Sequence, residues 1–358
     1  MAFRIVLLPG DGIGPEVIHQ AERVLNRVAD VFGCEFVFTR QRIGGSALAA
    51  GLSPLPPDTL ADVGGADAVL LGAVGDPAFD HRPAGSRPES GLLALRREMG
   101  VFANLRPVKV WAGLEDAGPL KPGVLTGTDL IVVRELLGGL YYGQPRGWDR
   151  ETGTAINTLG YSRPEIARVA RVAFDLARAR RKRLVSVDKA NVLETSQLWR
   201  AVVNDVARDY PDVQLSHEYV DACAMKLVVA PASFDVVLTE NLFGDILSDE
   251  AGAVCGSLGL LPSASLGAGP GLFEPVHGSA PTMAGKGVAN PCGAILSAAM
   301  LLRSGLHLPG EADAIDRAVA ETFAAGVVTG DLAVPGVSTA AFGDAVIARI
   351  RRDPPTRP

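Results

Sequence analysis

Residues 4–18 read RIVLLPGDGIGPEVI and combine a short apolar run, a glycine-rich turn and the start of a helical pattern. The apolar run has the length of a buried strand. Pro15 suits the first turn of a helix, and apolar side chains recur at helical spacing from Val17 to Val28, with Gly33 beyond the helix end. A strand that leads directly into a helix is typical of an α/β fold, in which helices cover both faces of a sheet.

The rest of the chain repeats this alternation. Further apolar runs of strand length lie at residues 68–71, 130–133, 184–187 and 236–238, with helical patterns between them. One helix is predicted to begin near Ser162, where SRPE has the pattern of a capping box, and to end in the basic run 178–183. We interpret that run as a solvated helix end rather than a ligand site, since positive charge favours a helix C-terminus.

Length and composition exclude several classes of protein. A chain of 358 residues suggests two domains, and a net charge of −6 argues against a nucleic-acid-binding protein, which usually carries a basic face. The four cysteines are widely spaced, no apolar run is long enough to span a membrane, and the N-terminus lacks the pattern of a signal peptide. We therefore expect a cytoplasmic protein without nucleic-acid or membrane partners.

The sequence GDGIG at residues 10–14 follows a strand and opens a helix, as the dinucleotide-binding fingerprint of a Rossmann fold does. Its spacing is GxGxG instead of GxGxxG, and the next strand-like segment ends in Arg40, where an acidic residue would bind a ribose. On these local grounds a tight glycine turn is as good an interpretation as a nucleotide loop.

Segment 147–161, GWDRETGTAINTLGY, interrupts the alternation of strands and helices. It could form a β-hairpin arm, which is only marginally stable alone and would be stabilised by pairing with another chain. This interpretation indicates a dimer. The alternative is a surface loop.

The stretch TENLFGDILSDEA, residues 239–251, places Asp245 and Asp249 four residues apart. If a helix begins near Asp245, the two carboxylates lie on one face, and a divalent cation such as Mg²⁺ would relieve their repulsion. The alternative is a solvated acidic helix start, which the helix dipole also favours.

Other candidate side chains follow predicted strands or lie in short basic contexts. Arginine suits bidentate binding of a carboxylate, although each arginine taken alone could be structural. Lys189 and Asp221 come directly after strand-like segments, where α/β sheets place their sites, and desolvation could lower the pKa of Lys189. The full set is Arg96, Arg106, Arg134, Tyr141, Lys189 and Asp221.

Seven segments in order carry a family resemblance: GDGIGPEV, RPESGLLALRREMGVFANLRPVKV, VRELLGGLYYGQPRG, VDKANVLETSQLW, YVDACAMKLV, NLFGDILSDEA and FEPVHGSAPTMAGKGVANP. Together they resemble the β-decarboxylating dehydrogenases of the isocitrate/isopropylmalate dehydrogenase family, over nearly the whole chain. The resemblance implies a two-domain α/β fold with a large mixed sheet that is not a Rossmann fold. Residues 1–101 and 256–358 would form one domain, and residues 102–255 a second domain with the arm.

The family reaction is the oxidative decarboxylation of a substituted malate with reduction of NAD. The resemblance implies a homodimer with shared active sites, in which Lys189 takes the proton of the substrate hydroxyl and Tyr141 protonates the enol left by decarboxylation. Mg²⁺ or Mn²⁺ would be held by Asp245, Asp249 and Asp221 of the partner subunit, and Asp221 would also contact substrate. The departing carboxylate would be bound by Arg96, Arg106 and Arg134. NAD would be bound by Ile13, Glu274, His277, Gly278, Ser279, Ala280, Thr282 and Asn290.

Leu92 and Leu93 lie four and three residues before Arg96, so at least one shares its helix face. By resemblance they form an apolar pocket for an isopropyl group, with Glu89 upstream and Val192 of the partner subunit. A third carboxylate would be unpaired there, so isocitrate should be excluded. The implied function is isopropylmalate oxidation in leucine biosynthesis. The alternative substrates are another 3-substituted malate, malate or tartrate, and the leucines could also be ordinary helix core.

A non-catalytic, nucleotide-sensing subunit is disfavoured, because such relatives have lost catalytic residues that this chain keeps. Thr282 is a departure from the family pattern, since NAD-specific members carry Asp there and NADP-specific members carry Lys. No Arg occurs in TGDLAVPG, residues 329–336, where Asp331 lies instead. We predict NAD, with weaker discrimination against NADP than is usual in the family.

Overall fold

The computed structural model describes residues 2–352. Within this range the chain divides into two compact units, and each is described by itself. Unit 1 comprises residues 2–101, 111–118 and 256–352, and unit 2 comprises residues 102–110 and 119–255. No helix in this range is long and apolar enough to cross a membrane.

Unit 1 contains a mixed sheet with helices on both faces. Its strands are β1 (Ala2–Gly10), β2 (Glu35–Arg40), β3 (Ala68–Ala73), β11 (Pro262–Leu266) and β12 (Gly271–Pro275). They lie in the order β2-β1-β3-β12-β11, and only β11 runs antiparallel to its neighbour β12. The order and the antiparallel strand differ from a Rossmann sheet.

The helices of unit 1 are α1 (Gly14–Phe32), α2 (Gly45–Ala49), α3 (Pro57–Gly64), α4 (Pro88–Glu98), α10 (Cys292–Met300), α11 (Pro309–Ala324) and α12 (Thr339–Ile347). α1 and α10 pack against the sheet and against each other; α11 packs on both of them, and α12 packs on α1. On the other face Val6 and Leu8 of β1 cluster with Val63 of α3 and Leu95 of α4. Because both faces are covered, β1 is apolar at consecutive positions, as predicted.

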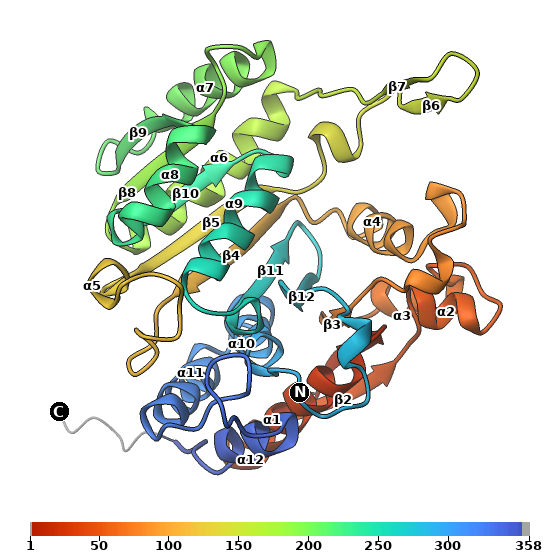
Figure 1. Cartoon of the computed structure of the whole chain (residues 1–358), viewed down its shortest axis with the longest axis vertical. Coiled ribbons are helices and arrows are strands. Elements are labelled where there is room, and N and C mark those ends of the chain that lie inside the picture. The colour runs from red at the N-terminus through yellow and green to blue at the C-terminus, as the bar shows by residue number, and fades with distance from the viewer. Residues whose placement is uncertain (1, 353–358) are drawn as a thin grey trace. The chain divides into compact units, whose positions relative to one another are not determined.

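Unit 2 has the strands β4 (Ala103–Lys109), β5 (Asp129–Glu135), β8 (Arg183–Asp188), β9 (Gln214–Tyr219) and β10 (Val236–Thr239). Their order is β4-β5-β10-β8-β9, and β4 alone is antiparallel. The helices are α5 (Pro122–Leu125), α6 (Arg163–Ala179), α7 (Glu194–Ala207), α8 (Val220–Val229) and α9 (Asn241–Val254). α6 packs with α7, and α8 with α9 (Figure 1). The α/β prediction with mixed pairing is confirmed.

Local signals explain where several elements begin and end. α1 has Pro15 in its first turn and ends at Gly33 in the left-handed region, as predicted. The capping box of α6 is confirmed, since the backbone N–H of Ser162 donates to the Glu165 carboxylate at 2.7 Å.

The basic run 178–183 spans the end of α6 and is largely exposed, as expected of a solvated helix end, and it also binds a buried carboxylate. Arg180 Nε donates to Asp235 Oδ1 at 2.8 Å, and the Arg181 backbone N–H donates to Oδ2 at 3.0 Å. Asp235 is 1% exposed and precedes β10. A buried carboxylate needs such partners, so the basic run serves this strand as well as the helix end.

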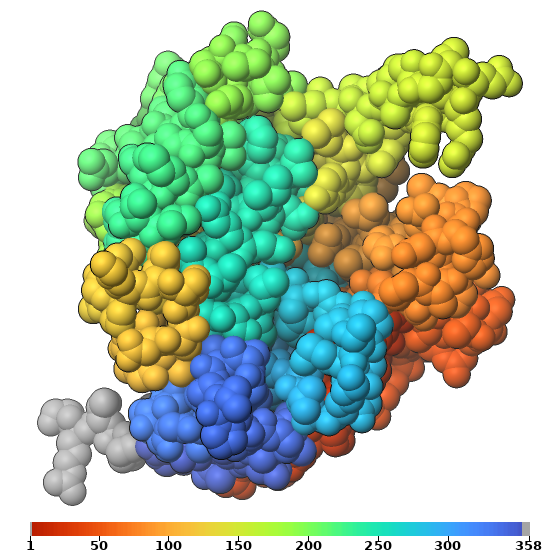
Figure 2. Space-filling view, viewed as in Figure 1, coloured from red at the N-terminus to blue at the C-terminus, as the bar shows by residue number. Residues whose placement is uncertain are grey.

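The arm is a short hairpin. β6 (Gly147–Asp149) pairs antiparallel with β7 (Thr154–Ile156), and the residues of both strands are exposed. Figure 2 shows the hairpin, in yellow-green, standing out from the surface of unit 2. The hairpin interpretation is confirmed, and its pairing with a second chain stays a prediction.

Candidate active site

The helix α9 begins four residues earlier than predicted. Glu240 is its N-cap, with a carboxylate oxygen that accepts the Phe243 N–H at 2.7 Å. The expectation of a helix start near Asp245 is therefore wrong. Asp245 and Asp249 lie in later turns on one face of α9, so the helix dipole at the first turn does not explain them.

Two buried arginines on neighbouring strands face these carboxylates. Arg106 of β4 and Arg134 of β5 are 6% and 1% exposed. Arg106 lies 3.3 Å from Asp245 and 3.2 Å from Asp249, and Arg134 forms a close ion pair with Asp245. The antiparallel β4–β5 pairing thus brings two cations to the side of α9 that carries two anions.

Tyr141 completes this cluster. Its hydroxyl donates to Asp245 Oδ2 at 2.7 Å, and the Arg134 guanidinium lies 5.5 Å from the centre of its ring. Burial, followed by the hydrogen bond to Asp245, raises the pKa of Tyr141 to about 12. The phenol therefore keeps its proton at neutral pH and is suited to donate it rather than to act as a base.

The two aspartates fit part of a cation site. Burial raises the pKa of Asp249, Arg106 opposes that effect, and the charge of Asp245 adds to it. A divalent cation would lower the cost of keeping both carboxylates ionised. Among residues 2–352, no three His, Cys, Asp or Glu side chains are grouped so as to hold a metal, so Asp221 does not join this pair within the chain.

Lys189 and Asp221 instead form a pair of their own in unit 2. Lys189 Nζ donates to Asp221 Oδ1 at 2.5 Å, and this hydrogen bond lowers the pKa of Asp221. The backbone N–H of Lys189 donates to Ser196 Oγ at 3.0 Å, which ties the turn after β8 to α7. Val192, in the same turn, is 65% exposed.

The predicted substrate residues of unit 1 lie on α4. Arg96 is buried and donates to Glu274 Oε1 at 2.7 Å. Leu92 packs against the core cluster of unit 1, so helix core accounts for at least part of its surface. Glu89 and Ser279 both lie near Gly75, because a Cβ on this glycine would be 3.3 Å from Glu89 Oε1 and 3.4 Å from Ser279 Oγ.

The GDGIG turn owes its glycines to close backbone contacts. A Cβ on Gly12 would lie 1.9 Å from the Ser279 carbonyl oxygen, and one on Gly10 would lie 1.9 Å from that of Ala73. The N–H of Ile13 donates to Ser279 O at 2.8 Å, and the Ile13 side chain is 5% exposed. The glycine-turn interpretation is favoured, and the turn is joined directly to the predicted cofactor segment.

In that segment, His277 and Asn290 already have hydrogen-bond partners, although Nε2 of His277 is buried without one. His277 Nδ1 lies 3.0 Å from Gly278 O, and burial lowers the pKa of His277, which favours the neutral ring. Asn290 accepts the Cys292 N–H and donates to Asp331. Thr282 is exposed, and Ala280 adopts a left-handed conformation with φ of 38°.

Two carboxylates that bind backbone N–H groups around the glycine turn and the cofactor segment were not predicted from the sequence. Asp11 is 6% exposed and accepts backbone N–H groups of Gly45, Ser46 and Gly75 at 2.8, 2.7 and 2.9 Å. Glu16 accepts the N–H groups of Gly285 and Gly287, within the cofactor segment. An acidic residue between two glycines after a strand, as in GDG, was the available signal for Asp11.

Comparisons with known proteins agree over nearly the whole chain. The sequence model of the family described as isocitrate/isopropylmalate dehydrogenase matches residues 4–346. A 3-isopropylmalate dehydrogenase of Aquifex aeolicus is 51% identical over 355 residues, with 98% of each chain covered. One of Anaeromyxobacter dehalogenans is 54% identical over 353 residues, which cover 98% of this chain and 100% of the relative. The crystal structure of isocitrate dehydrogenase from Methylococcus capsulatus has a TM-score of 0.87 at 36% identity, with 98% of this chain and 100% of that chain covered.

Proposed function

Because the chain belongs to the isocitrate/isopropylmalate dehydrogenase family, we propose that it catalyses the NAD-dependent oxidative decarboxylation of 3-isopropylmalate to 4-methyl-2-oxopentanoate in leucine biosynthesis. The observation that carries the proposal is the 51% and 54% identity with 3-isopropylmalate dehydrogenases over nearly their full length. These relatives do not favour another substituted malate as substrate. A biosynthetic role of this kind fits the expected cytoplasmic location.

The arginine cluster of unit 2 supports the chemistry. Arg106 and Arg134 would bind the carboxylate that leaves as CO₂, and Tyr141 would donate its proton to the enol carbon. Lys189 would accept the proton of the substrate hydroxyl. Arg96 keeps its proposed part in substrate binding.

Asp245 and Asp249, with Asp221 of the partner subunit, would hold Mg²⁺ or Mn²⁺. Carboxylate oxygens suit these ions, and two carboxylates on one helix face supply an incomplete ligand set within one chain. When bound, the cation acts as a Lewis acid on the substrate oxygens, and NAD accepts the hydride. In unit 1 the segment from Glu274 to Asn290, together with Ile13, would bind NAD.

A homodimer is proposed from exposed apolar side chains. Met225 and Val229 of α8 and Ile246 of α9 are 58%, 59% and 58% exposed, and Trp148 and Ile156 of the arm are 63% and 54% exposed. α8 and α9 pack together, and large apolar side chains left exposed on neighbouring helices are typical of protein interfaces. α8 carries Asp221 as well. A second chain bound to this face could therefore have Asp221, together with Lys189, placed in its own active site.

Substrate selectivity would rest on Leu92, Leu93, Glu89 and Val192 of the partner subunit. An apolar pocket rejects a third carboxylate, because that carboxylate would lose water without gaining a partner. Thr282 neither accepts strongly from the ribose hydroxyls nor pairs with a 2′-phosphate. The preference for NAD over NADP is therefore expected to be weaker than an Asp at this position would give.

Formation of NADH from 3-isopropylmalate tests the proposal. We expect turnover with Mg²⁺ or Mn²⁺, loss of turnover in EDTA, and recovery when either cation is restored in excess. The kcat/KM for isocitrate should be lower by about a thousandfold or more. An isocitrate value equal to or above that of 3-isopropylmalate would overturn the substrate assignment, and a higher kcat/KM with NADP would overturn the cofactor assignment.

A further inference from the structure

Asn241, the first residue of α9, is fully buried and uses both ends of its side-chain amide. Its Nδ2 donates to the carbonyl oxygens of Leu136 at 3.2 Å and Gly138 at 3.0 Å. Its Oδ1 accepts from Arg134 Nε at 3.0 Å and from Nη2 at 2.8 Å. The opposite amide orientation would set donor against donor and acceptor against acceptor, so these partners fix it.

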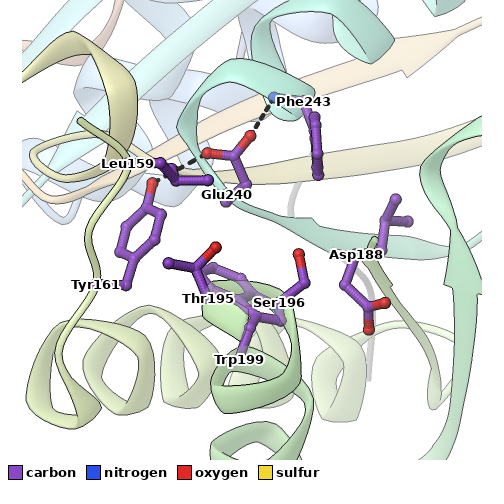
Figure 3. Close-up of a pocket in the computed structure, with 9 residues that line it drawn as sticks. Leu159, Tyr161, Asp188, Thr195, Ser196, Trp199, Glu240 and Phe243 are labelled. Carbon is purple, nitrogen blue, oxygen red and sulfur yellow. Dashed lines mark hydrogen bonds between the residues drawn. The ribbon is translucent and has the colours of Figure 1, made fainter. Parts of the chain in front are cut away.

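A buried network holds Asn241 in place. Its backbone N–H donates to the hydroxyl of Tyr161 at 3.0 Å, and that hydroxyl lies 3.3 Å from Glu240 Oε2. Figure 3 shows Tyr161 and Glu240 turned toward each other, with Glu240 bound to the N–H of Phe243. The start of α9 is thereby set against the segment that follows the arm.

Other residues near the start of α9 contact the remaining parts of the Arg134 side chain. A Cβ on Gly244 would lie 2.7 Å from Arg134 Cγ, so the glycine permits close packing of the arginine stem. Asp245 follows one residue later and meets the Nη1 end of the guanidinium. Asn241 therefore holds the Nε edge of Arg134, while Nη1 points to the predicted metal-binding and proton-donating groups.

Arg106 is held in the same manner. Its Nε donates to Asn104 Oδ1 at 2.7 Å, and Nη1 donates to Ser248 Oγ at 2.7 Å. Asn104 is 0% exposed and lies opposite Arg134 in the β4–β5 register. The two buried arginines that face α9, Arg106 and Arg134, are thus oriented at Nε by a buried neutral amide, although a carboxylate could accept the same hydrogen bonds.

We propose that Asn241 is a positioning residue that aims Arg134 at the substrate carboxylate without adding a second anion to the one that Asp245 already supplies. The inference rests on the proposed function. An Asp in this place would keep the two hydrogen bonds to Arg134, but it would lose those to Leu136 and Gly138 and would add an anion next to the cation that must attract substrate. Through Leu136 and Gly138, Asn241 also steadies the loop that leads to Tyr141.

The test compares the Asn241→Asp variant with the wild-type protein, each in the oligomeric state in which it is purified. Calorimetry measures the binding of 3-isopropylmalate in the presence of Mg²⁺ and, in a separate experiment, the binding of NAD. We expect the Kd for 3-isopropylmalate to rise about tenfold to a hundredfold, the range of one charge-assisted hydrogen bond, with the Kd for NAD unchanged within about twofold. Asn26→Asp, at an exposed asparagine of α1, is the matched control and should change neither value.

In an Arg134→Lys background, which keeps the charge and loses the fork, Asn241→Asp should raise the Kd by less than about threefold, because the two residues act together. Asn104→Asp is the second variant if Asn241→Asp fails to fold, and it should weaken substrate binding through Arg106. A folded Asn241→Asp or Asn104→Asp protein with a wild-type Kd overturns the inference. A wild-type protein that does not bind 3-isopropylmalate overturns the proposed function instead.

Discussion

Among residues 2–352, each buried arginine has a partner that determines how far its positive charge is balanced. Arg96 meets the carboxylate of Glu274, with both side chains 10% exposed or less, so the pair is electrically balanced. Arg106 and Arg134 meet neutral amides as well as aspartates. The balance between the arginines and the aspartates would change on cation binding. A bound cation would compete for the aspartates, so the arginines would be available to bind a substrate anion.

Lys189→Ala should abolish turnover while the fold remains intact. The side chain is the proposed base, and it is 27% exposed, so its removal leaves no large buried cavity. We expect kcat to fall by about a thousandfold, the scale of general-base catalysis. NADH formation measures this loss, and circular dichroism checks the fold.

The control for this change is Lys121→Ala, since Lys121 is also exposed and lies before α5. It should have wild-type activity. Near-normal turnover of Lys189→Ala would remove Lys189 from the mechanism.

Glu135 predicts a dependence of stability on pH. Burial raises its pKa above 4.5, although the N–H groups of Leu137 and Gly138 and the charge of Arg168 oppose the shift. The unfolded carboxyl therefore ionises first as the pH rises, and the folded state loses stability from about pH 4.5 upward.

Glu135→Gln should remove this contribution. As the pH rises above about 4.5, wild type should lose more stability than the variant, as measured by denaturant unfolding. Equal losses in the two proteins would show that Glu135 does not titrate as its burial implies.

At the scale of elements, the turn between β1 and α1 depends on backbone approach more than on ligand chemistry. Gly12 has φ of 57° and lies against the Ser279 carbonyl, whereas Gly33 has φ of 69° and no atom within 4 Å of an added Cβ. A comparison of substitutions at these two glycines therefore separates the free-energy cost of a left-handed conformation from that of a steric clash.

Gly33→Ala should lower the free energy of unfolding by about 1–2 kcal/mol, the cost of the left-handed conformation alone. Gly12→Ala should lower it by clearly more and should also weaken NAD binding, because Ser279 must move. Denaturant unfolding and NAD calorimetry give the two readouts. Equal destabilisation by both variants would show that the turn relaxes freely.

At the scale of the whole molecule, the chain presents a two-carboxylate half-site and a separate Lys189–Asp221 pair. In the proposed homodimer, shared active sites would join one half from each subunit, and the exposed apolar side chains of α8 and α9 would contact the second chain. Subunit mixing can test this arrangement without knowledge of the interface.

Lys189→Ala and Asp245→Asn should each be inactive alone. When they are unfolded together and refolded, half of the dimers would be mixed, and each mixed dimer would have one intact site. Recovery of about one quarter of wild-type activity is expected from this statistical pairing. Activity no greater than that of the separate variants, in a protein shown to be dimeric by sedimentation, would mean that the sites are not shared.

The sequence by itself determined the alternation of strands and helices, the limits of α1 and α6, the rejection of a Rossmann fold and the family. These depend on apolar periodicity, caps and ordered motifs, all of which are local in the chain. The start of α9 could not be predicted, because the capping role of Glu240 depends on its orientation rather than on its residue type.

The tertiary structure alone decided which partners meet. Asn241 lies 107 residues from Arg134 in the chain, and Asp235 lies 55 residues from Arg180, so no local pattern could pair them. Sheet register and helix packing bring such groups together, and burial then forces each polar atom to find a partner. For that reason the residues of the candidate site could be predicted from the sequence, whereas the ion pairs and hydrogen bonds that balance their charges could not.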